Sequence, residues 1–152
     1  MPPSWNTTRI ENRYGGGIPD VHVCVGGHPF WIELKTTKNN RINLSAHQVA
    51  WLFSYSQSGG VGFILVRHLE HRSMYLFDGV HGRGLAEHGF RAVDLGPGPN
   101  GSGSGLKGSG PDGSGSGPKL SGPDGSGSGI KVPCRWYGSD WPGLLDAMIQ
   151  PK

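Results

Sequence analysis

The chain has 152 residues, but 28 of them are glycine and most of these cluster late, so only residues 5–95 can bury a sizeable core. The net charge of +3 is compatible with a polyanionic partner and is too small to demonstrate one. No apolar run approaches the ~20 residues that cross a bilayer, the N-terminus lacks a secretion-signal layout, and two distant cysteines give no disulfide framework. We therefore expect one small cytoplasmic domain.

Two short strands are predicted near the N-terminus, after an ambiguous first segment. Residues 6–14 fit either a short helix or an extended arm, and three consecutive glycines at 15–17 then interrupt the pattern. The two strands span residues 20–25 and 30–35 and are joined by a turn at Gly26-Gly27. This spacing is typical of two neighbouring antiparallel strands.

The second strand carries two charges on an otherwise apolar element. Because side chains alternate along a strand, one side receives Phe30, Ile32 and Leu34 and the other receives Trp31, Glu33 and Lys35. Charges on such an element are costly unless they have a chemical role. If the strands pair, Asp20 reaches the pocket of Glu33 and Lys35. Two carboxylates and an ammonium can hold a hard divalent cation and activate a water.

A basic loop and a capped helix follow the second strand. The loop covers residues 36–43 and includes Lys38 and Arg41. Ser45 and Gln48 then fit a capping box, in which the serine caps a backbone amide and the glutamine reaches back. Apolar side chains recur at helical spacing after this point, until a Ser-Gly-Gly sequence ends the predicted helix.

Two further strands and one helical turn complete the predicted core. Residues 61–66 are a continuous apolar run that is too short for a helix and is typical of a buried central strand. A turn rich in histidine and arginine precedes a strand at 73–77, and residues 84–89 fit one helical turn. The histidines of this region are spread over turns without cysteines at ligand spacing, so we do not expect a zinc site.

A Gly/Ser/Pro-rich segment at 96–131 divides this core from the C-terminus. Residues 101–112 and 113–124 are copies of one unit, and 125–131 begin a third copy. Such a segment cannot bury a core and is expected to be a flexible linker, for which tandem duplication and engineering are both possible origins. Residues 132–152 are too apolar for a free tail. We expect a strand and a capped helix there, docked on the core or on a partner subunit.

The order of these features resembles a family of nucleases. Asp20 after a proline, followed by the strand that ends in Glu33-Leu34-Lys35, is similar to the PD-(D/E)XK motif. The run over 31–66 resembles the Holliday junction resolvases of archaea and phages, in which a basic loop, a serine-capped helix with a glutamine and a Gly-Gly before an apolar strand follow this motif. The resemblance covers about residues 9–77. It implies an α/β restriction-endonuclease-like core with a mixed central β-sheet flanked by helices.

The resemblance also implies a metal-dependent active site. Asp20, Glu33 and the backbone carbonyl of Leu34 are expected to bind Mg²⁺, or Mn²⁺ in its place, with Glu11 assisting. Lys35 is expected to orient or deprotonate the attacking water and to stabilise the negative charge that develops on the phosphate.

Further polar residues have expected roles around this centre. Gln48 either positions Lys35 or the backbone near the site, or only closes the capping box. Candidates for contacts with DNA phosphates are Arg9, Arg13, Lys38 and Arg41. Because resolution of a junction requires two symmetrical nicks, the resemblance implies a twofold homodimer that acts on branched DNA, in a bacterial or phage-infected cell.

The favoured function is therefore that of a Mg²⁺-dependent endodeoxyribonuclease, and specifically a Holliday junction resolvase. A nicking or trimming nuclease of phage replication or recombination is an alternative with the same core. A non-catalytic DNA-binding protein is a second alternative, against which the complete set of Asp20, Glu33 and Lys35 argues. In isolation, Glu33 and Lys35 also fit two solvated charges on an exposed strand face.

Overall fold

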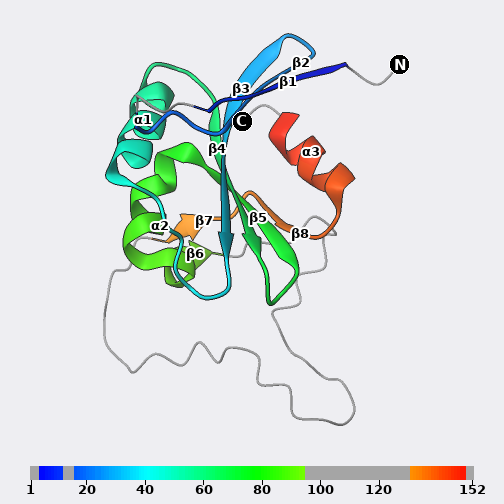
Figure 1. Ribbon diagram of the computed structural model, residues 1–152. Helices are drawn as coiled ribbons and strands as arrows, with labels where there is room; N and C mark the ends of the chain where they lie inside the picture. Colours follow the sequence, from blue (N-terminus) through cyan, green and yellow to red (C-terminus); the bar gives the residue numbers. More distant parts are fainter. Residues whose placement is uncertain (1–3, 12–15, 95–130, 150–152) are drawn as a thin grey trace, which may run out of the picture.

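The computed structural model of the chain describes residues 4–11, 16–94 and 131–149 (Figure 1). Its strands are β1 (Trp5–Arg9), β2 (Val21–Val25), β3 (His28–Thr37), β4 (Gly62–His68), β5 (Ser73–Asp78), β6 (Val93–Asp94), β7 (Val132–Pro133) and β8 (Trp136–Gly138). Its helices are α1 (Ala46–Gln57), α2 (Gly82–His88) and α3 (Trp141–Ile149). None of these helices combines the length and the apolar character that crossing a membrane requires. Arg13 and the expected linker up to residue 130 lie outside the described residues.

Six strands form one mixed sheet in the order β1-β2-β3-β4-β5-β8. β3 and β4 run parallel and are connected through α1, whereas the other neighbouring strands are antiparallel. A parallel pair requires such a crossover, because a tight turn can join only antiparallel strands. Helices α1 and α2 lie on one side of the sheet and α3 lies on the other (Figure 1). The predicted α/β class, with a mixed central sheet flanked by helices, is confirmed.

Each face of the sheet packs into its own apolar cluster. The α3 side contains Val23, Val25, Phe30, Ile32, Phe63, Leu65, Met74, Leu76, Trp136, Leu144 and Met148. The α1 side contains Ile42, Leu44, Leu52, Ile64, Val66, Tyr75, Phe77, Leu85, Ala92 and Val132. Phe30 and Ile32 thus face α3, as the alternation of β3 predicts, while the ring of Trp31 contacts Trp51 on α1. The opposite side of β3 is therefore the side on which Glu33 and Lys35 meet α1.

The described part of the first segment, which its sequence leaves undecided between a helix and an arm, contains the edge strand β1. β1 pairs antiparallel with β2, so that Trp5 lies opposite Val25. Trp5 is half-buried and the other four residues of β1 are exposed, which leaves this strand without an apolar pattern of its own. Its conformation depends on the backbone hydrogen bonds that β2 supplies.

The C-terminal segment completes the sheet of its own chain. β8 pairs antiparallel with β5, with Trp136 opposite Leu76. α3 follows directly and contributes Leu144 and Met148 to the buried cluster on its side of the sheet. Residues 132–149 of this segment therefore pack on the core of the same chain.

The docked position of this segment predicts an unreactive thiol at Cys134. Its Sγ lies 3.7 Å from the carbonyl oxygen of Leu76 and 2.9 Å from that of Trp136, and either oxygen can accept its one S–H hydrogen. Burial raises the pKa of the Cys134 thiol to about 12. Only about one molecule in ten thousand is then a thiolate at pH 8, so a Cys24→Ser variant should react with Ellman's reagent at least ~10³-fold more slowly when native than when unfolded. Equal rates for the native and the unfolded protein would show that the segment does not dock.

Candidate functional site

Glu33 is a buried carboxylate in the middle of the sheet. It lies on β3 opposite Ile64 of the parallel strand β4, and its side chain is 1% exposed. Lys35 lies two residues along on the same face and is 19% exposed, so it reaches solvent at the contact between β3 and α1, which is called the seam below. The alternation of β3 places both charges against the first turn of α1.

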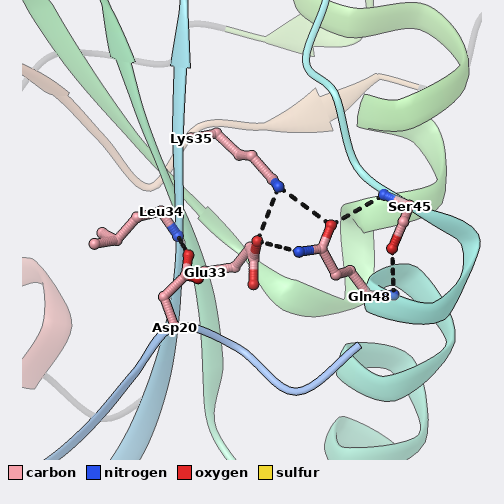
Figure 2. A network of polar contacts seen from close by, with 6 residues as sticks. All are labelled: Asp20, Glu33, Leu34, Lys35, Ser45 and Gln48. Carbon is pink, nitrogen blue, oxygen red and sulfur yellow. Dashed lines mark hydrogen bonds and ion pairs between the residues drawn. The ribbon is translucent and has the colours of Figure 1, made fainter. Parts of the chain in front are cut away.

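A closed set of polar contacts links these charges to α1 (Figure 2). Lys35 Nζ lies 2.9 Å from Glu33 Oε1 and donates a hydrogen bond to Gln48 Oε1 at 3.2 Å. Gln48 Nε2 donates to the same Glu33 Oε1 at 2.5 Å. The glutamine therefore contacts both the acid and the lysine, and its amide fixes their relative positions.

The same glutamine also closes the capping box. Gln48 Oε1 accepts a hydrogen bond from the backbone amide of Ser45 at 3.0 Å, and Ser45 Oγ accepts one from the backbone amide of Gln48 at 3.2 Å. The two expected roles of Gln48 are thus not exclusive in the structure. The cap anchors the glutamine on the first turn of α1, and the remaining amide contacts reach across to β3.

The environment of Glu33 opposes its negative charge. Burial raises the pKa of this carboxyl above its ordinary value, Lys35 acts in the opposite direction, and the charge of Asp20 adds to the rise. Glu33 Oε1 receives both donors, while Oε2 is buried and has no hydrogen-bond partner among the described residues. A buried carboxylate oxygen without a donor is costly, and a bound cation would remove that cost.

Asp20 lies beside Glu33, at the start of the neighbouring strand. Asp20 Oδ2 accepts a hydrogen bond from the backbone amide of Leu34 at 2.9 Å (Figure 2). The backbone carbonyl of Asp20 accepts one from the backbone amide of Ile10 at 2.8 Å. These contacts hold the second carboxylate against β3. The pairing of β2 with β3 therefore brings Asp20 to the acid and lysine pair, as the sequence predicts.

This donor set fits a hard divalent cation. Such ions prefer carboxylate and carbonyl oxygens, and Asp20, the unpartnered oxygen of Glu33 and the carbonyl of Leu34 are of that type. Among the described residues, no cluster of three or more acidic, histidine or cysteine side chains exists that could hold a metal. Asp20, Glu33 and one backbone carbonyl are thus the candidate ligands, and a small ligand set of this kind is typical of Mg²⁺ sites that retain several waters.

Glu11 is not part of this arrangement. Its carboxylate is 68% exposed and forms an ion pair with Arg9 at 3.2 Å. The strand β1 ends at Arg9, and Glu11 follows it on the surface. The structure thus places the exposed Glu11 apart from the buried Glu33 and the half-buried Asp20.

The expected DNA contacts that are described lie on the surface. Arg9 is 79% exposed, and Lys38 and Arg41 are exposed in the loop between β3 and α1. The loop follows the end of β3 that carries Lys35, so both cations lie within a few residues of Lys35 along the chain.

The sequence reasoning missed one structural contribution to this site, at Gly17. Its φ of +103° is a left-handed conformation that favours glycine, and a side chain there would collide with the backbone carbonyl of His47. The close approach holds the segment before Asp20 on the first turn of α1. The three consecutive glycines were the available signal, although by themselves they indicated only a break.

Two comparisons with known proteins find similarity over part of the chain. The sequence pattern of the family described as archaeal Holliday junction resolvase (Hjc) matches residues 5–81. Among solved structures, Hjc of Archaeoglobus fulgidus, a Holliday junction resolvase from an archaeal hyperthermophile, is 20% identical with a TM-score of 0.41. That match covers 49% of this chain and 64% of the other, so the chain spans less than two thirds of that relative. No curated protein sequence matches the chain.

Proposed function

The chain belongs to the archaeal Holliday junction resolvase family, and from this premise we propose that it is a metal-dependent endonuclease that cuts branched DNA. The observation that carries the proposal is the environment of Glu33. Its buried carboxylate has one oxygen shared by Lys35 and Gln48 and a second oxygen without a hydrogen-bond partner among the described residues. An ion pair that only stabilises the fold gains nothing from a buried oxygen without a hydrogen-bond partner, because such an oxygen is energetically costly.

The proposed ligands are Asp20, Glu33 and the backbone carbonyl of Leu34. They would hold Mg²⁺, with Mn²⁺ as a substitute, and the bound ion would supply charge neutralisation at the phosphate and a more acidic water. Glu11 is left out of this set because its exposed carboxylate already pairs with Arg9.

Lys35 is the proposed group that acts on the attacking water. Its ammonium contacts both Glu33 and Gln48, and these two contacts keep it next to the carboxylate of Glu33. There it orients the water and stabilises the negative charge that develops as the water oxygen bonds to phosphorus. The bond between phosphorus and the leaving sugar oxygen breaks. The attacking water loses a proton to solvent and the leaving oxygen takes one from solvent, so a phosphate monoester and a hydroxyl remain. Gln48 is a positioning residue, because it acts through the lysine and the acid.

DNA binding is proposed for the basic surface around this site. Lys38 and Arg41 lie in the loop beside Lys35, and Arg9 lies on the edge strand β1. Arginine and lysine contacts of this kind position a phosphate backbone without reading its sequence. A junction has two equivalent strands to cut, so we propose a twofold homodimer as the active unit.

The test compares a labelled four-way junction with a linear duplex that contains the same arm sequences, each with Mg²⁺ and with EDTA. The proposal expects paired, symmetrical nicks in the junction that require the metal, and little cutting of the duplex. Equal cutting of both substrates would indicate a general nicking or trimming nuclease. Binding without cutting in Mg²⁺ or Mn²⁺ would contradict the catalytic proposal.

A further inference from the structure

A row of four aromatic rings begins beside the candidate site, on the same face of the sheet. His22 of β2 contacts Trp31 of β3, with ring centroids 4.9 Å apart. Trp31 contacts Trp51 of α1 at 5.4 Å, and Trp51 stacks on Tyr55 at 4.9 Å. The row therefore runs from the sheet onto the side of α1.

The row and the catalytic network are built on the same two elements. Trp31 precedes Glu33 by two residues on one face of β3, which places the two Cα atoms roughly 6.6 Å apart along the strand. On the helix, Trp51 lies one turn after Gln48. Along the seam between β3 and α1, the aromatic row therefore lies on one side of Glu33 and the basic loop lies on the other.

The rings of this row remain partly open to solvent. All four are half-buried, whereas Phe30, Phe63 and Phe77 are fully buried in the two clusters. Trp31 belongs to neither cluster, and Trp51 only packs against the edge of one. Each of the four side chains therefore keeps surface that the two apolar clusters do not cover.

A polar, exposed strip of the sheet borders the row. Thr8 of β1 is the direct partner of His22, and His22 is the direct partner of Trp31, so their side chains share one face. Thr8 is exposed, as is Asn6 two residues earlier on the same face. The rings therefore border an exposed surface, formed by β1, on one side of the row.

We infer that this row, defined by His22, Trp31, Trp51 and Tyr55, is a stacking surface for an unpaired nucleobase next to the phosphate that is cut. The inference rests on the proposed nuclease function, and it adds a determinant of substrate choice. Planar aromatic rings stack on the face of any base, because every base has a π-face. A base within a continuous duplex is stacked on both sides, so it has no face to offer until it is unpaired at some energetic cost. At a branch point the stack of bases is interrupted, so a base there is exposed or unpaired at a lower cost than within a continuous duplex. The row therefore favours single strands and branch points over duplex.

The competing role for these rings is to fasten α1 to the sheet. The two roles predict different results when Trp31 is replaced by leucine, which preserves apolar bulk and removes the planar ring. If the rings only pack α1 against the sheet, the variant should have a lower unfolding temperature and equally reduced affinity for all DNA substrates. Stacking predicts a loss of affinity that depends on whether the DNA offers an unpaired base.

The first measurement is DNA affinity in EDTA, where nothing is cut, for Trp31→Leu and Trp31→Phe. Each variant is titrated with a four-way junction, a single strand and a duplex. We expect Trp31→Leu to bind the junction and the single strand about 5-fold or more weakly, with less than about 2-fold change for duplex and a smaller loss for Trp31→Phe. The matched control is Trp141→Leu, an exposed tryptophan on α3 at the other face, which should change none of the three affinities.

The second measurement keeps the inference testable if Trp31→Leu does not fold. Tryptophan emission of the wild type should be quenched by a single strand, and a Trp31→Phe/Trp51→Phe double variant should lose most of that quenching. Trp141→Phe should retain it. If the row variants keep the affinities and the quenching of the wild type, the stacking surface is wrong and the nuclease proposal stands. If the wild-type protein binds no DNA, both are wrong.

Discussion

Replacing Glu33 by glutamine should lower the rate of metal-dependent DNA cleavage by at least about 10³-fold and leave the protein folded. The substitution keeps the shape of the side chain and one oxygen for Lys35 and Gln48, but it removes the negative charge that a cation needs. Because burial already disfavours the charged form of Glu33, a neutral isostere should be at least as stable as the wild type in EDTA. Cleavage of a labelled junction and thermal unfolding of the same samples measure the two effects.

Thermal unfolding also separates metal binding from catalysis in this experiment. A ligand that binds only the folded state raises its stability, so Mg²⁺ should raise the unfolding temperature of the wild type and have little effect on Glu33→Gln. Lys35→Met is a useful companion, because it should lose cleavage to a similar degree while its proposed metal ligands remain in place.

The matched control is Glu11→Gln, which neutralises an exposed acid outside the buried network. Its cleavage rate should stay within about 3-fold of the wild type, since an exposed ion pair contributes little. A loss in Glu11→Gln as large as that in Glu33→Gln would return Glu11 to the site. Normal cleavage by Glu33→Gln would contradict the proposed active site itself.

The centre of the site was predictable because short-range patterns determine it. Alternation along one strand places Glu33 and Lys35 on the same face, and the capping box places Gln48 on the first turn of the helix that follows. The parallel crossover then brings that turn back over the strand. Asp20 required one additional step, the pairing of two strands across Gly26-Gly27, which is also local in sequence.

The features that were missed depend on partners far away in the sequence. β1 has almost no apolar pattern, so its strand conformation follows from pairing with β2 and could not be read from Trp5–Arg9 alone. For the same reason, Glu11 could not be excluded as a ligand, because its surface position depends on where that edge strand ends. The aromatic row likewise needs the register of β2 against β3 and the packing of α1 before its four rings become neighbours.

The largest expected effect on stability is at Trp136, in the C-terminal segment beyond the region that the family pattern matches. Trp136 is 3% exposed, lies opposite Leu76 of β5 and belongs to the same buried cluster as Leu144 of α3. Trp136→Ala should lower the free energy of unfolding by about 3–5 kcal/mol, because it leaves a large cavity between the sheet and α3. That is a large share of the roughly 5–15 kcal/mol typical of a whole domain, and urea denaturation measures it directly.

Two matched substitutions identify the origin of that effect. Trp141→Ala removes the same type of ring from a position that is 58% exposed, and it should cost less than about 0.5 kcal/mol. Trp136→Phe should cost less than about 1.5 kcal/mol, because the indole Nε1 has no hydrogen-bond partner within the described part of the chain and its loss leaves no new unsatisfied group. Equal, small effects of both alanine variants would mean that the segment contributes nothing to the core. A large effect confined to Trp136→Ala would instead make β8 and α3 part of the folding unit that holds β3, and therefore the candidate site, in place.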